Sequence, residues 1–222
     1  MNRMRSFTRF ALVGTFALLF AGFVAPTNGL AVDFLLTSDH CTGTCGTPPF
    51  GTVSVTQSGA NVNFSVTLNA GITFAQTGAA DGQIFKFNGT GVAVGDIVVG
   101  AHNPALQANT GALNGDGTGD FTFGISCPTC GQGPTGFGGT ITFTVLNATV
   151  AEVTQANNLG NIFVADILGL NGNTGPVDAS TPTTSVPEPS TIFLYGLGAA
   201  MLIAGHKWRK NSLAGNGGEL AS

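Results

Sequence analysis

The sequence predicts a mainly β fold, an antiparallel β-sandwich for which a jelly roll is one form. Three observations support this prediction. Short apolar runs are rich in Val, Thr and Phe, residues that favour strands. Glycine, at 34 of 222 residues, and asparagine separate these runs, as tight turns require. The 17 phenylalanines are spread among the runs and can fill a core, which argues against low-complexity disorder.

The first strands in chain order form a predicted hairpin. Thr52–Thr56 and Val62–Leu68 both alternate apolar and polar residues, and Ser58-Gly59-Ala60-Asn61 lies between them. Seven further runs bring the number of predicted strands to nine: Ile72–Ala75, Gln83–Phe87, Asp96–Val99, Phe121–Ser126, Thr140–Leu146, Ala148–Thr154 and Asn161–Leu168. Short strands with one apolar face each are typical of two sheets packed face to face.

The charge composition argues against a nucleic-acid partner. Only 8% of the residues are charged, whereas an average soluble domain has about 25%. Between Val32 and Ser180 there are nine acidic residues, one lysine (Lys86) and no arginine. Phosphate backbones are bound mainly through lysine and arginine, which release the condensed counterions.

The N-terminal residues have the pattern of a signal peptide. Arg3, Arg5 and Arg9 precede the apolar run Phe10–Val24, and small residues stand at Gly29 and Ala31. We expect cleavage after Ala31, so that residues 1–31 are the signal peptide. The alternative, an uncleaved anchor, is disfavoured because the run is short for a spanning helix.

The C-terminal residues have three features in order. Val186-Pro187-Glu188-Pro189-Ser190 is an extended polar segment, since each proline disfavours helix in the preceding residue. An uncharged apolar run over residues 192–205 follows, and we expect it to be one transmembrane helix. The basic residues Lys207, Arg209 and Lys210 then predict a cytoplasmic end, which would leave the middle of the chain outside the inner membrane.

This arrangement resembles the PEP-CTERM sorting domain, whose signature corresponds to Pro187-Glu188-Pro189. The resemblance implies an exported protein recognised by exosortase, a membrane-embedded transpeptidase-like enzyme, and a Gram-negative bacterium that makes extracellular polysaccharide, a further partner. It also implies a location in the periplasm, membrane-anchored, with display at the surface or release after processing. The tail over residues 211–222 departs from the family, which usually ends just past the basic cluster.

The segments between these two ends complete the predicted organisation. Residues 32–170 are the exported β-sandwich domain. Residues 171–185, rich in Gly, Pro, Ser and Thr, are predicted to be a flexible linker. Residues 186–210 are the sorting domain.

Four cysteines form two clusters, Cys41 with Cys45 and Cys127 with Cys130. An oxidising compartment favours two disulfides, and the sequence permits pairing within or between the clusters. Zinc knuckles and a redox-active Cys-x-x-Cys pair are the alternatives. His40, next to Cys41, would be the first extra ligand to test in a zinc site.

A possible calcium loop is formed by Asn114, Asp116, Thr118 and Asp120, which place oxygen atoms at alternate positions between glycines. Because no acidic residue stands at the twelfth position, a solvated turn is the favoured interpretation. We expect no cofactor and no catalysis, since the domain has no arginine or tyrosine and no serine-elbow or phosphate-loop motif. The predicted function is that of a non-catalytic envelope or matrix protein, and the alternatives are a calcium- or carbohydrate-binding module and a thiol-redox enzyme.

Overall fold

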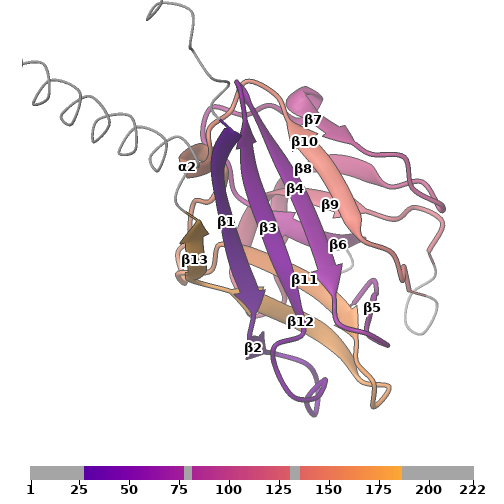
Figure 1. Ribbon diagram of the computed structural model, residues 1–222. Coiled ribbons are helices and arrows are strands. Elements are labelled where there is room, and N and C mark those ends of the chain that lie inside the picture. Colours follow the sequence, from indigo (N-terminus) through magenta and orange to yellow (C-terminus); the bar gives the residue numbers. More distant parts are fainter. Residues whose placement is uncertain (1–27, 78–81, 131–135, 187–222) are drawn as a thin grey trace, which may run out of the picture. The chain divides into compact units, whose positions relative to one another are not determined.

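The computed structural model describes residues 28–77, 82–130 and 136–186, which form a mainly β fold with antiparallel pairing (Figure 1). The strands are β1 Asn28–Leu36, β2 Ser38–Asp39, β3 Gly51–Ser58, β4 Asn61–Leu68, β5 Thr73–Phe74, β6 Gln83–Phe87, β7 Ile97–Val99, β8 Gln107–Asn114, β9 Asp120–Ser126, β10 Ile141–Val145, β11 Phe163–Leu168, β12 Thr174–Ala179 and β13 Pro182–Val186. Two short helices are described, the 3-10 helix η1 over Val94–Asp96 and α2 over Val150–Val153.

The strands form two sheets. Sheet A has the order β13-β1-β3-β4-β10-β7, and sheet B has the order β2-β12-β11-β6-β9-β8, with β5 also paired to β11. Every register that the structure gives for a strand pair is antiparallel. The predicted mainly β, antiparallel fold is confirmed.

The predicted hairpin is confirmed as β3 and β4. Val53 and Val55 are buried while their neighbours along β3 are less so, which is the alternation that the sequence shows. Gly59 turns the chain with a φ of 59°, in the left-handed region that glycine adopts without a steric penalty.

Phenylalanines from both sheets meet in one core. Phe64 of sheet A stacks on Phe143 at a centroid distance of 4.4 Å and meets Phe163 of sheet B edge-on at 5.9 Å. Phe163 also stacks on Phe85, at 5.8 Å. These rings are almost fully buried, and they lie between the inner faces of the two sheets. Their packing is that of the core of a β-sandwich.

The prediction of a flexible linker over residues 171–185 is wrong. These residues contain β12 and most of β13. β12 pairs with β11 along its length, from Leu168↔Thr174 to Phe163↔Ala179, and its Val177 and Ala179 are buried. The Gly, Pro, Ser and Thr content misled the prediction, because apolar residues at alternate positions still give this strand a buried face.

The strand predicted over Ala148–Thr154 is also wrong, because the structure has the short helix α2 there. Thr149 and Glu152 form a capping box at its start, in which the Glu152 carboxylate accepts hydrogen bonds from Thr149 N at 2.7 Å and from Thr149 Oγ1 at 2.8 Å. The first helical residue, Val150, donates its backbone N–H to Gln57 Oε1 at 2.9 Å, which ties the helix to β3.

The two ends of the described domain are paired with each other. β1 begins at Asn28, before the predicted cleavage point, and its Ala31 is the register partner of Val186 in β13. Within the described ranges no helix is long and apolar enough to cross a membrane. The apolar run 10–24 and the predicted transmembrane helix 192–205 lie outside these ranges.

Candidate functional site

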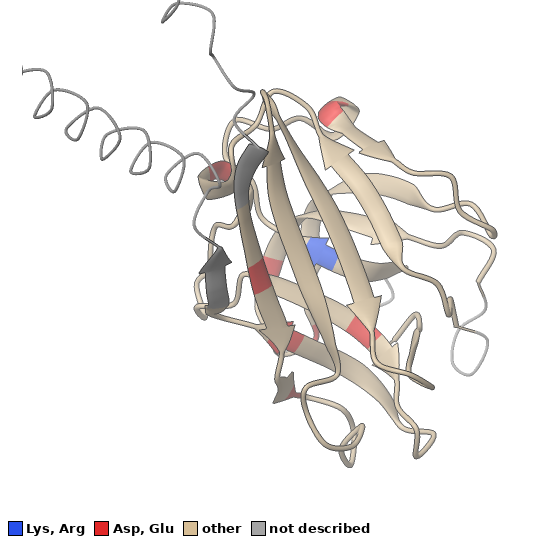
Figure 2. Cartoon of the chain, in the orientation of Figure 1, with Lys and Arg blue, Asp and Glu red and all other residues tan. Residues whose placement is uncertain are grey.

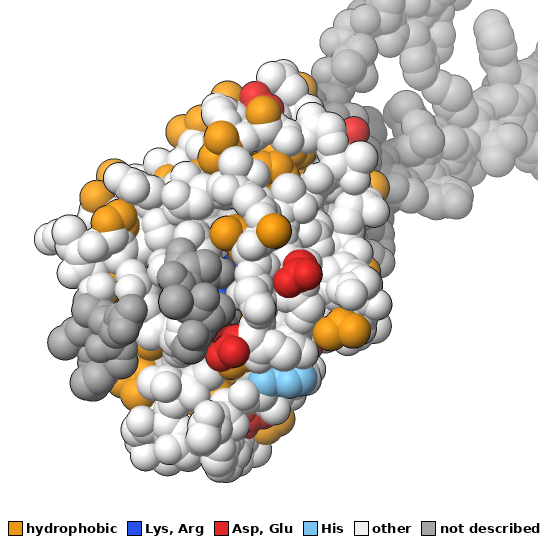
Figure 3. Space-filling view, turned by 180° about the vertical axis from the view of Figure 1, so that it is seen from behind, with side chains coloured by type: hydrophobic (Ala, Val, Ile, Leu, Met, Phe, Trp, Pro, Cys, Tyr) orange, Lys and Arg blue, Asp and Glu red, His pale blue; other side chains and the backbone are white. Residues whose placement is uncertain are grey.

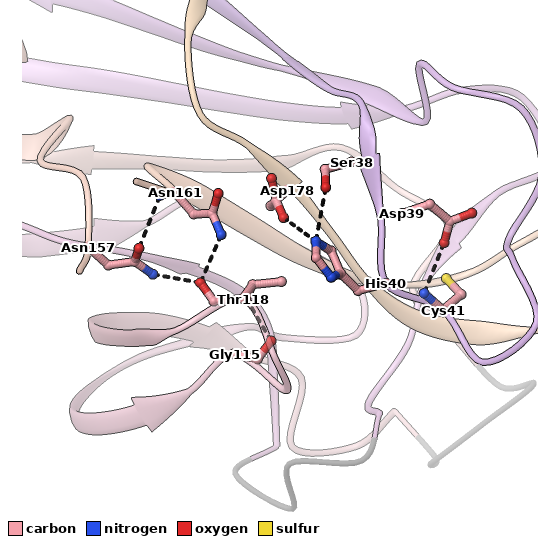
Figure 4. Close-up of polar contacts among 9 residues, drawn as sticks. All are labelled: Ser38, Asp39, His40, Cys41, Gly115, Thr118, Asn157, Asn161 and Asp178. Atoms are coloured by element: carbon pink, nitrogen blue, oxygen red, sulfur yellow. Dashed lines mark hydrogen bonds and ion pairs between the residues drawn. The ribbon is translucent and has the colours of Figure 1, made fainter. Parts of the chain in front are cut away.

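The first cysteine cluster is a short disulfide loop whose backbone and side-chain donors bind the carboxylate of Asp39. Cys41 and Cys45 are bonded, with Cα atoms 5.6 Å apart. Asp39, at the end of β2, accepts hydrogen bonds from the backbone N–H of Cys41 at 2.9 Å and of Cys45 at 2.9 Å, and from Thr44 Oγ1 at 2.6 Å (Figure 4 draws the first). Partial burial works to raise the pKa of Asp39, but these hydrogen bonds and nearby His40 outweigh it and hold that pKa below 3.8.

The second cysteine cluster is also a local disulfide, between Cys127 and Cys130, whose Cα atoms are 5.3 Å apart. Cys127 is fully buried after β9, and its carbonyl accepts a hydrogen bond from Gln76 Nε2 at 2.9 Å. The predicted two disulfides are therefore present, and the pairing left open by the sequence is within each cluster.

The disulfide between Cys41 and Cys45 argues against a zinc site at this cluster. In the described residues, ligand atoms of Asp39, Cys41 and Cys45 lie within 4.8 Å of one another. Both sulfurs belong to the disulfide, so neither offers the thiolate that binds zinc. What remains in the cluster is one carboxylate, already engaged by three donors.

His40 joins β2 to β12 rather than the cysteines. Its Nε2 lies 2.7 Å from Asp178 Oδ2 and 2.9 Å from Ser38 Oγ, as Figure 4 shows. Burial raises the pKa of Asp178 above 3.8, and His40 and Ser38 offset part of that increase. His40, the first extra ligand to test under the zinc alternative, thus makes its polar contacts at the edge of sheet B.

Ser38, His40 and Asp178 are the residue types of a nucleophilic triad, but their geometry differs from one. A serine triad needs the serine on one ring nitrogen and the carboxylate on the other, so that the base can pass a proton along. Here both partners contact the same atom, Nε2. The arrangement holds β2 against β12 and does not orient the histidine to activate the serine.

The proposed calcium loop is the turn between β8 and β9. Asn114 Oδ1 accepts the backbone N–H of Asp116 at 2.6 Å, and the buried Thr118 hydroxyl donates to Gly115 O at 2.6 Å. The carbonyl of Thr118 accepts from Asn157 Nδ2 at 2.7 Å and from Asn161 Nδ2 at 2.9 Å (Figure 4).

Asn114 and Thr118 are two of the four residues of the possible calcium loop. Their side-chain oxygen atoms make hydrogen bonds within the turn. They do not direct these atoms at a common point, as a calcium site requires. The geometry is that of a turn, the interpretation that the sequence favoured, and its own side chains contribute hydrogen bonds to it.

A buried ion pair was not predicted from the sequence. Lys86 Nζ lies 2.8 Å from Asp166 Oδ2, and both side chains are 1% exposed. Lys86 is in β6 at the centre of sheet B, where Figure 2 shows the lysine segment in blue. The two residues are 80 positions apart, so only the register of the sheet brings them together.

Large exposed hydrophobic side chains are scattered over the described surface. Val98 in β7 is 51% exposed, and Leu159 and Leu170, in loops on either side of β11, are 59% and 74% exposed. The view from behind in Figure 3 likewise shows separate hydrophobic groups and a few acidic side chains among neutral polar ones. Isolated groups of this kind do not define a docking surface.

The fold and these contacts define a class, a disulfide-bonded antiparallel β protein domain. The family model described as the PEP-CTERM protein-sorting motif matches residues 185–210, directly at the end of this domain. The chain therefore carries this sorting motif, and the match does not extend over the domain. No curated protein and no solved structure matches the chain.

The predicted sorting residues can be placed only in part. Val186 ends β13, and the family match begins one residue earlier, at Ser185. Pro187, Glu188, Pro189 and Ser190 lie outside the described residues, as do the basic residues Lys207, Arg209 and Lys210. The motif implies an exported protein with a membrane-anchored precursor.

Proposed function

We propose that this protein is a non-catalytic module of the cell envelope or extracellular matrix, delivered through its C-terminal sorting motif. The observation that carries the proposal is the family match over residues 185–210, which begins within β13, the last described strand of the β domain. Exosortase is the proposed processing partner, and extracellular polysaccharide is the proposed surrounding material.

The chemistry of the domain supports export. Two disulfides form and persist in oxidising compartments outside the cytoplasm. The predicted signal peptide over residues 1–31 would provide the route, and the basic residues after 205 would keep that end cytoplasmic. The domain would then face the periplasm before processing.

The proposed lack of catalysis rests on the described polar groups. Ser38, His40 and Asp178 meet at one ring nitrogen, and Asp39 accepts three hydrogen bonds that close a loop. Both arrangements hold neighbouring chain segments in place. Each cysteine is in a disulfide, so the thiol-redox alternative would require one of these bridges to be reduced to its thiols.

Glu188→Ala tests the proposed sorting. In a host that has the sorting enzyme, we expect the variant to accumulate as an unprocessed precursor on a blot, while the native chain loses its C-terminal segment. Glu219→Ala makes the same chemical change outside residues 185–210 and should be processed normally. Equal processing of native chain and Glu188→Ala would refute recognition through this motif.

Protease accessibility tests the proposed topology independently. Protease added to intact spheroplasts that hold the unprocessed Glu188→Ala precursor should reach residues 32–186 and spare the basic end. A domain that is degraded only after the cells are lysed would contradict a periplasmic location.

A further inference from the structure

Lys86 and Asp166 lie side by side on one face of sheet B. Their strands, β6 and β11, are hydrogen-bonded neighbours with Lys86↔Val164 as register partners. Because side chains alternate along a strand, Asp166 shares the face of Val164 and hence that of Lys86. The aromatic residues next to Lys86, Phe85 and Phe87, take the opposite face and pack in the sandwich core.

The amine and the carboxyl group of this pair are already in direct contact. Lys86 Nζ is 2.8 Å from Asp166 Oδ2, and Oδ2 is bonded directly to the carbonyl carbon Cγ. Groups held within roughly 3–3.5 Å of each other react far faster than the same groups free in solution. Both side chains are 1% exposed, so the pair is shielded from water that would compete for the carbonyl carbon.

The reaction needs a neutral amine and a carboxylic acid. Removing separated charges from water is costly, and one proton moved from ammonium to carboxylate along the contact gives a neutral amine and a carboxylic acid. A second carboxyl on the same face, that of Asp178, is the register partner of Val164 on the other side of β11. Burial raises the pKa of Asp178, so burial on this face favours the neutral form of that carboxyl group.

We propose that Lys86 and Asp166 become joined by an intramolecular amide. In this step the neutral Lys86 Nζ attacks Asp166 Cγ, a C–N bond forms, and the Cγ–OH bond breaks. The amine loses one proton, the hydroxyl group leaves with it as one water molecule, and no oxidant or other reagent takes part. The product is a covalent link between β6 and β11 that closes a loop between positions 80 residues apart.

The amide does not depend on the proposed function, because only the folded domain is needed to form it. Unlike the two disulfides, it would survive reducing agents. It would also connect two central strands of sheet B, whereas each disulfide closes a loop of a few residues.

Trypsin offers a direct test, because Lys86 is the sole lysine or arginine between Arg9 and Lys207 in the sequence. The full-length exported protein is purified, reduced, denatured and digested. Trypsin needs the free lysine side chain, so an amide at Lys86 should leave the whole span from residue 10 to residue 207, or to its processed ends, as one fragment. A free Lys86 should give two fragments instead.

A chymotryptic digest identifies the partner. Cleavage beside phenylalanine and leucine should yield a cross-linked peptide that contains positions 86 and 166 and is lighter than its two separate parts by one water. A modification of Lys86 by another group would block trypsin without producing this peptide and would overturn the proposal.

Two variants serve as controls. Lys86→Arg keeps the positive charge and the trypsin site but should form no such amide, so its denatured chain should split in two. Asp166→Ala leaves Lys86 with no carboxyl group to join at position 166 and should also split. The native chain decides the question even where a variant fails to fold: two tryptic fragments of unmodified mass from the native protein would refute the amide.

Discussion

The two sheets of the domain bury their strands differently. In sheet A, β3 and β4 alternate between buried positions and more exposed ones, so one face packs in the core and the other meets solvent. In sheet B, all five residues of β6 are buried, and β11 and β12 are buried at every position but one. These three strands are therefore buried on both faces, and the face turned away from the sandwich core holds Lys86, Asp166 and Asp178.

The comparison shows where the sequence can mislead. A strand with one exposed face can be recognised in the sequence by its alternation of apolar and polar residues. A strand buried on both faces can also contain polar residues, and the sequence alone would place these in solvent. Here polar residues of sheet B make contacts between neighbouring segments, Lys86 with Asp166 and Asp178 with His40. We expect sheet B to be sensitive to loss of single polar groups and sheet A to tolerate it.

The largest expected effect comes from Lys86→Met. It leaves Asp166 buried without the lysine ammonium, and breaking a buried pair in this way costs about 3–5 kcal/mol of unfolding free energy. Loss of the proposed amide would add about 4–5 kcal/mol in the chain-entropy model. Because total stabilities are about 5–15 kcal/mol, the variant should be close to unfolding at room temperature.

The matched change in sheet A is Ser54→Ala, which removes the hydrogen bond from Ser54 Oγ to Asp33 Oδ1, 2.6 Å long. We expect a loss of about 0.5–1.5 kcal/mol. Urea denaturation of both variants measures the difference. Similar losses in the two variants would mean that the sheets do not differ in this respect.

A double variant then separates the two contributions of Lys86. Lys86→Met with Asp166→Leu replaces the pair by apolar side chains and should recover most of the cost of a broken ion pair. If the native chain carries the amide, the double variant should remain less stable by the cross-link contribution.

The next effect concerns the edge of sheet B. Replacing Cys41 and Cys45 by alanine opens a short disulfide loop, which the chain-entropy model values at about 2 kcal/mol. For a domain of this size, we expect a fall in Tm of about 4–8 °C. Hydrogen exchange should become faster first at the backbone N–H of position 45, which donates a hydrogen bond to Asp39 in the native protein. Exchange in the β3–β4 hairpin should not change. Equal acceleration in both places would contradict a local role of the loop.

The smallest expected effect is a pH dependence at Asp178. Because burial raises its pKa, the folded state binds more protons than the unfolded state between pH 3.8 and the raised value. Stability should fall as pH rises through this window, and the loss should persist above it. Asp178→Asn should remove that step, which denaturation at a series of pH values can measure.

Asp39 serves as a control, because its effect on the pH dependence of stability has the opposite sign. Its pKa is lowered on folding, so its contribution is present above pH 3.8 and is lost as pH falls through the lowered value. Asp39→Asn should therefore flatten the acid side of the profile. A profile unchanged by either substitution would show that these carboxyl groups do not control the pH dependence.

The sequence predicted strands in both sheets: the run Gln83–Phe87 coincides with β6, although all five of its residues are buried. The β3–β4 hairpin follows directly from alternation around Gly59. Two errors had available signals: Asn171-Gly172 is a strong hairpin turn pattern before β12, and Thr149-x-x-Glu152 is a capping-box pattern before α2. The linker prediction rested on Gly, Pro, Ser and Thr content, and the strand prediction over Ala148–Thr154 rested on apolar residues. Neither used the local turn and capping signals.

The polar contacts of sheet B could not be predicted in the same way. Lys86 meets Asp166, and His40 meets Asp178, only once the order and register of β2, β12, β11 and β6 are known. The disulfide pairing was open for a similar reason, since spacing alone permits local and long-range bridges. The sorting motif needed no such knowledge, because its recognition depends on consecutive residues.

The pairing of β1 with β13 has a mechanical consequence. In an antiparallel pair, the start of β1 and the end of β13 lie at the same end of the ladder. A force that pulls these two ends apart loads one rung at a time. In a chain cleaved after Ala31, the first rung is Val32 with Ser185, followed by Asp33 with Thr184. β13 should therefore unzip under low tension, while the strands of sheet B, which are not pulled directly, remain folded.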